Sequence, residues 1–399
     1  MTLCPGLIAE NVSGTVTSFK ERSQAGFSSF CCGLTQTGYR NIPENASISR
    51  MAEPAHRRIH GASRVTIREI AEEAGVSIAT VSRVLNGRED VSPETRELVG
   101  RVIRNHGYTA NRSARGLSAG RSGLIGVLVP LLYPAYFSGI LAGTAQALSE
   151  HDMHIVLSPT GGEHDREVSV VDRLHGLADG ALIILPNESS EELAGLLDRG
   201  FRFVVIDPLM PLHERIPSVS AAHTSGTDQA MQHLLELGHR RIAHIPGPSG
   251  WVATEDRRRG YRAALATAGI PLDPALEIEA VPEIFPGRDA AGSLLDLPDR
   301  PTAIFAFNDN IAIGAMQAAR ARGLRVPEDL SIVGFDDVEH ATIVTPALTT
   351  VRQPLAEMGR TAVSLLSRLL ERQRFETLHV ELATRLVVRD STAPPVRLH

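Results

Sequence analysis

The chain of 399 residues has three cysteines, one lysine and only 4% aromatic residues. Its cysteines, Cys4, Cys31 and Cys32, all lie near the N-terminus, so no disulfide framework holds the remainder, as is usual in a reducing compartment. No apolar run reaches the roughly 18 residues of a membrane span. No basic stretch followed by an apolar one marks an export signal. These absences predict a cytoplasmic protein without a membrane partner.

Short motifs of nucleotide binding and catalysis are also missing. No G-x-G-x-x-G follows an expected strand, and neither G-x-x-x-x-G-K-[ST] nor H-E-x-x-H occurs. The one G-x-S-x-G, at residues 116–120, does not follow an expected strand and so does not form a nucleophile elbow. The three cysteines lack the spacing of a zinc site. His223, His239 and His244 can be imagined as ligands, but we expect them to have polar surface or core roles. We therefore predict no enzyme activity, no cofactor and no metal.

The net charge of −6 alone argues against a nucleic-acid partner, but the charge is unevenly distributed. Residues 51–121 hold 12 Arg against 8 Asp and Glu. A basic head on an acidic body suits a protein whose head meets phosphates, although ordinary charge scatter is the alternative.

Residues 1–63, rich in Ser, Gly, Asn and Thr, predict a disordered extension. Translation from Met51 instead of Met1 is a hypothesis that the sequence leaves open.

The most informative segment reads T-I-R-E-I-A-E-E-A-G-V-S-I-A-T-V-S-R-V-L-N, from residue 66 to 86. Thr66 and Glu69 fit a capping box at the start of one helix. Gly75 permits a tight turn, and Ser77 can cap a second helix. Two short helices joined in this way predict a helix-turn-helix, whose second helix enters the major groove of DNA.

A third helix is predicted from Pro93 to about residue 106, since a serine cap and a first-turn acid surround the proline. Its expected buried stripe, which faces the first two helices, consists of Leu98, Val99, Val102 and Ile103. The three helices predict a DNA-binding domain over 64–110. Residues 111–121 form a basic linker, in which Gly116 weakens a possible short helix by about 1 kcal/mol.

From residue 122 onward, short apolar runs alternate with amphipathic segments. We expect strands at 124–129, 154–158, 181–185, 203–207, 241–245, 303–307 and 331–335. We expect helices at 137–150, 163–177, 188–199, 225–237, 255–268, 287–296 and 310–322. This alternation predicts parallel sheets covered on both faces. Seven such units exceed the needs of one open sheet, so we predict two doubly wound α/β subdomains.

Polar residues stand where several of these strands end. Asp207 ends one strand, Asn308 follows another and Asp336 follows a third, while Arg257 opens a helix. Ligands of such folds bind beyond the carboxyl ends of the strands. Each residue has an alternative role as a helix cap, about as probable as ligand contact at any one position. Together they favour a binding cleft for a hydroxyl-rich ligand.

The sequence resembles the lac-repressor (LacI) family of bacterial transcription regulators. The similarity runs from about Val65 to Val388. It rests on G-V-S-I-A-T-V-S-R-V-L-N (75–86), V-S-P-E-T-R (91–96), H-G-Y (106–108), N-R-S-A-R-G-L (111–117), F-N-D-N-I-A-I-G-A (307–315), V-P-E-D-L-S-I-V-G-F-D-D (326–337) and P-A-L-T-T-V-R-Q-P (346–354). The resemblance implies a helix-turn-helix head, a hinge at 111–121 and a body at 122–392 that resembles a periplasmic-binding-protein fold.

Within that body the resemblance implies an N-subdomain of about 122–222 and 353–378. The C-subdomain would then comprise about 223–352 and 379–392.

The resemblance also implies which residues meet DNA. Ile78 and Ala79 match base-reading positions, and Arg83 matches the family arginine, whose guanidinium suits guanine O6 and N7. Leu117 matches the hinge leucine that enters the minor groove. The positions that match phosphate, backbone or other hinge contacts are Thr66, Ser77, Ser82, Asn86, Ser92, Tyr108, Asn111 and Ala114.

For the effector, the matching positions are Tyr136, Phe137, Asp207, Arg257, Asn308 and Asp336. Two departures are Pro282, where the family often has an aromatic residue, and Ala222, which replaces a common aspartate at the crossing between subdomains.

We therefore expect a homodimeric, sequence-specific DNA-binding regulator, a repressor, that recognises a palindromic operator. A small molecule would shift the subdomain angle and weaken DNA binding. A sugar or sugar-like polyol is favoured, and purine-like or other small ligands remain open. Inducer and corepressor both remain open. The alternatives are a solute-binding protein of the sugar-transport type, which predicts an export signal and no basic head, and a sugar-processing enzyme that uses Asp207 or Asp336.

Overall fold

The computed structural model describes residues 65–85, 87–88, 90–108, 122–132, 135–373 and 377–396. The predicted extension and hinge lie outside these ranges. Within them, no helix combines the length and apolarity that crossing a membrane requires. The same ranges contain no cluster of three or more His, Cys, Asp or Glu side chains suited to a metal ion.

Three helices form the head. They are α1 (Ile67–Glu73), α2 (Ile78–Leu85) and α3 (Pro93–Asn105). The capping box of Thr66 and Glu69 is present at α1, which confirms the predicted helix start. Ile70, Val81 and Val99 are fully buried and join the three helices in one core. The expected place of Leu98 in that core is wrong, because this side chain is 38% exposed.

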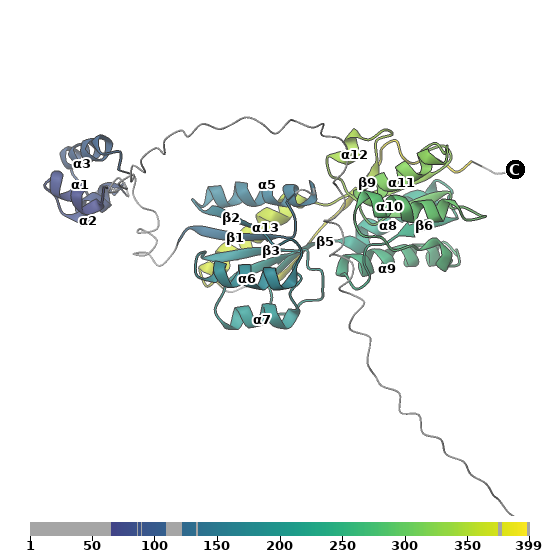
Figure 1. Ribbon diagram of the computed structural model, residues 1–399, viewed down its shortest axis with the longest axis horizontal. Helices are drawn as coiled ribbons and strands as arrows, with labels where there is room; N and C mark the ends of the chain where they lie inside the picture. The colour runs from purple at the N-terminus through teal and green to yellow at the C-terminus, as the bar shows by residue number, and fades with distance from the viewer. Residues whose placement is uncertain are drawn as a thin grey trace, which may run out of the picture. The chain divides into compact units, whose positions relative to one another are not determined.

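The first sheet has six parallel strands in the order β10-β5-β4-β3-β1-β2 (Figure 1). The strands are β1 (Leu124–Val129), β2 (His154–Pro159), β3 (Gly180–Ile184), β4 (Phe203–Ile206), β5 (Ser218–Ala221) and β10 (His379–Leu382). Its helices are α5 (Ala135–Glu150), α6 (His164–His175), α7 (Ser190–Asp198) and α13 (Leu355–Leu370). Side chains of α5 and α13 share one hydrophobic core with the sheet, and those of α6 and α7 share another, so both faces are covered.

The second sheet has the order β11-β9-β8-β7-β6, and all its strands are parallel except β11, which is antiparallel to β9. Its strands are β6 (Ile242–Ile245), β7 (Ala303–Ala306), β8 (Ser331–Asp336), β9 (Thr349–Arg352) and β11 (Arg385–Val387). Its helices are α8 (His223–Glu236), α9 (Val252–Thr267), η1 (Pro274–Leu276), α10 (Ile284–Leu295), α11 (Asp309–Ala321) and α12 (His340–Ile343).

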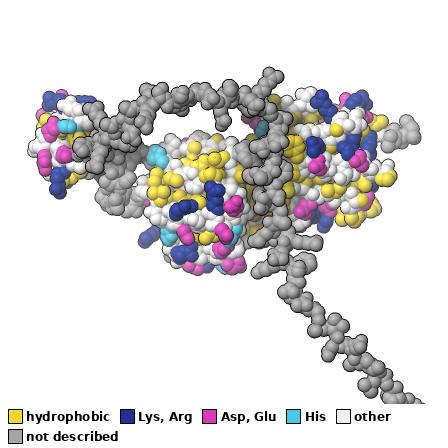
Figure 2. Space-filling view, in the orientation of Figure 1, with side chains coloured by type: hydrophobic (Ala, Val, Ile, Leu, Met, Phe, Trp, Pro, Cys, Tyr) yellow, Lys and Arg dark blue, Asp and Glu magenta, His cyan; other side chains and the backbone are white. Residues whose placement is uncertain are grey.

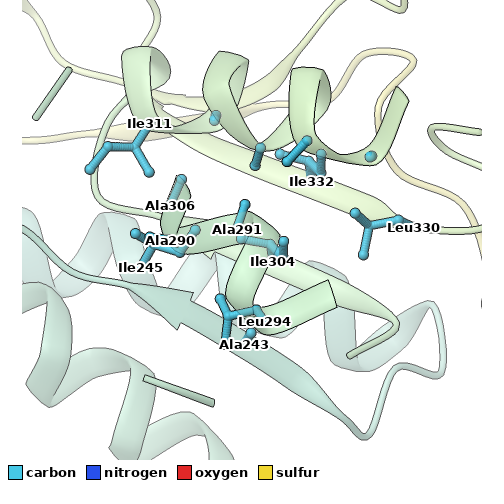
Figure 3. Packing of buried hydrophobic residues seen from close by; sticks show 14 of the residues in the cluster. Ala243, Ile245, Ala290, Ala291, Leu294, Ile304, Ala306, Ile311, Leu330 and Ile332 are labelled. Carbon is cyan, nitrogen blue, oxygen red and sulfur yellow. The ribbon is translucent and has the colours of Figure 1, made fainter. Parts of the chain in front are cut away.

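Small side chains build much of the second core. Figure 3 shows Ala290, Ala291 and Leu294 lying close to Ala243 and Ile304 of the sheet. Alanines permit short distances between a helix and a sheet, which explains how a chain with few aromatic residues reaches a dense interior.

The chain passes between the two sheets three times, after β5, β9 and β10. The predicted assignment of residues 379–382 to the C-subdomain is wrong. These residues form β10, which pairs in parallel with β5 of the first sheet from His379 to Leu382. Backbone pairing along β5 keeps the chain in the first sheet for one more strand before it crosses to β11.

Candidate functional site

The start of α2 presents an exposed surface on the head. Ser77 Oγ accepts a hydrogen bond from Thr80 N at 3.1 Å and caps the helix. Ile78 and Ala79 follow, and both are exposed. Both predicted base-reading side chains are thus accessible, and their apolar surface suits a thymine methyl group.

Arg83 lies in the last turn of α2. Its Nε lies 3.5 Å from Asp90 Oδ2, and both side chains are more than half exposed. An exposed ion pair of this kind contributes about 0–1 kcal/mol to stability. The guanidinium can therefore leave Asp90 at little cost and turn to a guanine edge, where a bidentate contact is worth about 1–3 kcal/mol.

The hydroxyl groups predicted to meet phosphates also have local roles. Thr66 and Ser92 each accept a hydrogen bond from the backbone N–H three residues further on, at the starts of α1 and α3. Ser82 is half-buried, and Tyr108 packs against the core of the head. The remaining predicted DNA contacts, Asn86, Asn111, Ala114 and Leu117, lie outside the described residues.

A second group of polar residues gathers at the carboxyl ends of the strands. Asp207 follows β4 and Asp336 ends β8, and both have positive φ angles, of 53° and 117°. Asn308 follows β7, and Gln353 follows β9. Arg257 comes from α9. All five are at most 9% exposed, so desolvation makes their mutual interactions strong.

Asp207 accepts two hydrogen bonds from different elements. Tyr136, on α5, donates its hydroxyl to Oδ2 at 2.6 Å. His223, the first residue of α8, lies with Nε2 3.0 Å from Oδ1. Both oxygens of Asp207 thus have a partner, and the carboxylate joins α5 to the start of α8.

Arg257 is held by aromatic rings and by hydrogen bonds. Its Cζ lies 3.7 Å from the ring centroid of Phe335 and 4.3 Å from that of Phe307. Nη1 donates to the backbone carbonyl of Phe307, and Nη2 lies 3.2 Å from His223 Nδ1. A cation on two ring faces gains stabilisation that increases when water is excluded.

Asp336 and Asn308 are held by neighbouring loops. Gln353 Nε2 donates to Asp336 Oδ1 at 2.7 Å. Asn308 Oδ1 caps α11 through Ile311 N, and its Nδ2 donates to the carbonyl oxygen of Pro282 at 3.3 Å. Asn308 therefore has the capping role that its sequence position allowed, and its predicted effector contact stays a prediction.

The pKa values of Asp207 and Asp336 are shifted in opposite directions. Burial opposes ionisation of Asp207, but His223, Tyr136 and Arg257 outweigh it and lower the pKa of this carboxyl. Burial raises the pKa of Asp336 to about 7, against the opposite influence of Arg257 and Gln353. Burial also lowers the pKa of Arg257, although both aspartates favour its charge. Asp207 thus carries a firm negative charge opposite Arg257, while Asp336 is only partly ionised near neutral pH, so little net charge remains, which suits an uncharged polar ligand.

Two buried polar atoms of this cluster have no hydrogen-bond partner among the described residues. They are Arg257 Nε, a donor, and Gln353 Oε1, an acceptor. Buried groups left unpaired cost about 1–3 kcal/mol each. A hydroxyl group can both accept and donate, so ligand hydroxyls match this unmet demand.

The predicted aromatic pair has two different environments. Tyr136 reaches Asp207, whereas Phe137 is 6% exposed and belongs to the core of the first sheet. Their rings are 5.4 Å apart in an edge-on arrangement. Effector contact by Phe137 stays a prediction.

Sequence reasoning missed His223 and Gln353. His223 was expected to have a core or surface role, and Gln353 stood inside a quoted motif without a role. Their positions in the sequence could have identified them. His223 is the first polar residue after β5, Gln353 is the first after β9, and the chain crosses between the sheets after each of these strands.

Comparisons with known proteins identify the families of the head and of the body. The model of the bacterial regulatory proteins of the lacI family matches residues 66–111, and that of the periplasmic binding protein-like domain matches residues 231–392. The regulator CelR of Thermobifida fusca is 37% identical over 337 residues, which cover 82% of this chain and 98% of CelR. Catabolite control protein A of Priestia megaterium is 32% identical over 329 residues, 82% of this chain and 99% of that protein. The chain belongs to the LacI family.

Solved structures support the same assignment. The lac repressor dimer bound to operator and the anti-inducer ONPF is 31% identical, with a TM-score of 0.75 over 82% of this chain and 99% of that one. A complex of CelR with cellobiose is 35% identical, with a TM-score of 0.64 over 82% of this chain and 100% of that one. This LacI-family protein is a DNA-binding transcriptional regulator with a ligand-binding body.

Proposed function

We propose that this LacI-family regulator represses transcription from a palindromic operator and releases it when a sugar binds at the polar cluster. The single observation that carries the effector class is the pair of buried unpaired atoms, Arg257 Nε and Gln353 Oε1, beside balanced charges. The hydroxyl groups of a sugar can both accept from the donor and donate to the acceptor, whereas an ion would disturb the balance of charge.

Relatives support this effector class. One similar structure is a complex with cellobiose, and two similar proteins are named ribose operon repressors. The transport-type alternative is disfavoured because it lacks a DNA-binding head, whereas the lacI model matches residues 66–111 here. We propose that the protein acts by binding alone, without catalysis, and in the cytoplasm.

In the proposed complex, Arg83 reads a guanine and Leu117 enters the minor groove. Ile78 and Ala79 contact base edges, while the predicted hydroxyl positions, together with Asn86, Asn111 and Ala114, hold the backbone. The protein acts as a homodimer. Hydrophobic side chains on the subdomain of the first sheet, visible over α5 in Figure 2, support a dimer, as does the edge strand β2, where Leu157 is 41% exposed.

A thermal-shift screen of sugars and nucleobases on the purified protein tests the effector class. We expect at least one sugar to raise the melting temperature of the wild-type protein and to leave the melting temperature of Arg257→Met unchanged. The matched control is Arg325→Met, which removes an exposed arginine paired with Asp329. Stabilisation by nucleobases alone, or a shift retained in Arg257→Met, would overturn the proposal.

A further inference from the structure

His223 stands at the first crossing of the chain between the two sheets. It is the first residue of α8 and is separated from β5 only by Ala222. Although it is 3% exposed, it has a polar partner on each ring nitrogen. Its ring also lies 5.9 Å from that of Phe335, which itself supports Arg257.

The partners of His223 fix its protonation state. The guanidinium of Arg257 only donates hydrogen bonds, so Nδ1, 3.2 Å from Nη2, has to accept. A carboxylate only accepts, and Tyr136 already donates to the other oxygen of Asp207, so Nε2, 3.0 Å from Oδ1, has to donate. Both contacts form together only when the ring is neutral with its proton on Nε2.

A continuous chain of hydrogen bonds therefore passes through this ring. It runs from the Tyr136 hydroxyl to Asp207, on to His223, then to Arg257 and the carbonyl of Phe307. Tyr136 and Asp207 lie in the subdomain of the first sheet, and Arg257 and Phe307 lie in the subdomain of the second sheet.

We propose that His223 is a positioning residue that orients Arg257 for the effector. By accepting from Nη2, while the Phe307 carbonyl accepts from Nη1, it fixes the rotation of the guanidinium about its Nε–Cζ bond. Nε remains as the nitrogen that lacks a partner. This inference deepens the proposed function and rests on it for the role of Arg257 in binding.

Measurements without ligand test the positioning role of His223 separately from the proposed sugar-binding function. In deuterated full-length protein near neutral pH, long-range ¹H–¹⁵N spectra report the tautomer of a histidine ring. We expect His223, assigned by its loss in His223→Asn, to carry its proton on Nε2. A ring protonated on Nδ1, or on both nitrogens, would overturn the proposal even if sugars bind.

Two substitutions separate the two contacts of the ring. His223→Asn places an oxygen near the position of Nδ1 and can still accept from Arg257. His223→Gln places its amide near the position of Nε2 and keeps only the link to Asp207. We expect separate Nη signals for Arg257, the mark of slow guanidinium rotation, in wild type and His223→Asn but not in His223→Gln.

Sugar binding then provides the functional readout. For any sugar found in the screen, we expect affinity within about threefold of wild type in His223→Asn and a loss of about tenfold or more in His223→Gln, about 1.4 kcal/mol. Equal Nη spectra in the two variants would refute the positioning role. Spectra as expected without any sugar binding would instead leave His223 in its role and refute the proposed effector.

Discussion

The substitution Glu188→Gln tests whether two buried carboxyl groups, Glu167 on α6 and Glu188 just before α7, bind a proton in the folded state. Glu167 and Glu188 are 0% and 3% exposed. Glu167 Oε2 accepts from the backbone and side-chain nitrogens of Asn187, both at 3.3 Å. Glu167 Oε1 and both oxygens of Glu188 have no partner among the described residues. Two carboxylates only accept hydrogen bonds, so a proton on one of them supplies the missing donor.

The direction in which pH changes the free energy of unfolding follows from the pKa shifts of these two carboxyl groups. Burial, together with the charge of Glu167, raises the pKa of Glu188 from 4.5 to about 8. Burial also raises the pKa of Glu167. The folded state therefore binds protons more tightly than the unfolded chain between about pH 4.5 and pH 8, and the free energy of unfolding falls as the pH rises through this window. At about 1.4 kcal/mol per pKa unit, the loss is on the order of 5 kcal/mol.

Glutamine at position 188 supplies a permanent N–H donor of the same shape. We expect Glu188→Gln to be more stable than wild type at about pH 8.5 and to have a flatter pH dependence, measured by urea denaturation at several pH values. The exposed neighbour Glu191→Gln is the matched control and should follow wild type. An equal destabilisation of Glu188→Gln at all pH values would refute the proton bound by this pair.

Three further substitutions test the head and the packing of the body. Arg83→Ala should cost about 1–3 kcal/mol of operator affinity and relax preference at one base position; an unchanged binding-site profile from selected DNA would contradict this role. Gly143→Ala should lower stability by more than about 2 kcal/mol in chemical denaturation, because its Cβ would lie 1.8 Å from the carbonyl oxygen of Ala356. Gly195→Ala, whose Cβ would meet nothing closer than 3.9 Å, should instead gain up to about 1 kcal/mol, and equal effects of both would refute the packing argument.

Elements with a strong local pattern were predictable from the sequence. The capping residues Thr66 and Ser92, and the alternation of apolar strands with helices, depend on neighbours a few residues away. Strand β5 was missed because Ser218–Ala221 has small, mixed side chains, and its place comes from pairing with β4 and β10. Strand β10 was misassigned for a related reason, since pairing partners far along the chain decide its sheet.

The candidate site was predictable where strand ends alone bring residues together, as for Asp207 and Asp336. Contacts that depend on side-chain direction were not predictable. Whether Phe137 points to the core or to a ligand, and whether His223 meets Arg257, depends on packing between elements distant in the sequence.

The central claim is that a sugar bound at Arg257 changes operator affinity, and one titration tests it most directly. The dissociation constant for a palindromic operator, selected from random DNA, is measured at fixed salt with increasing amounts of a sugar that stabilises the protein. We predict that the dissociation constant rises to a plateau, that operator weakens sugar binding by the same factor, and that Arg257→Met removes both effects. An operator affinity unchanged at saturating sugar would contradict the account.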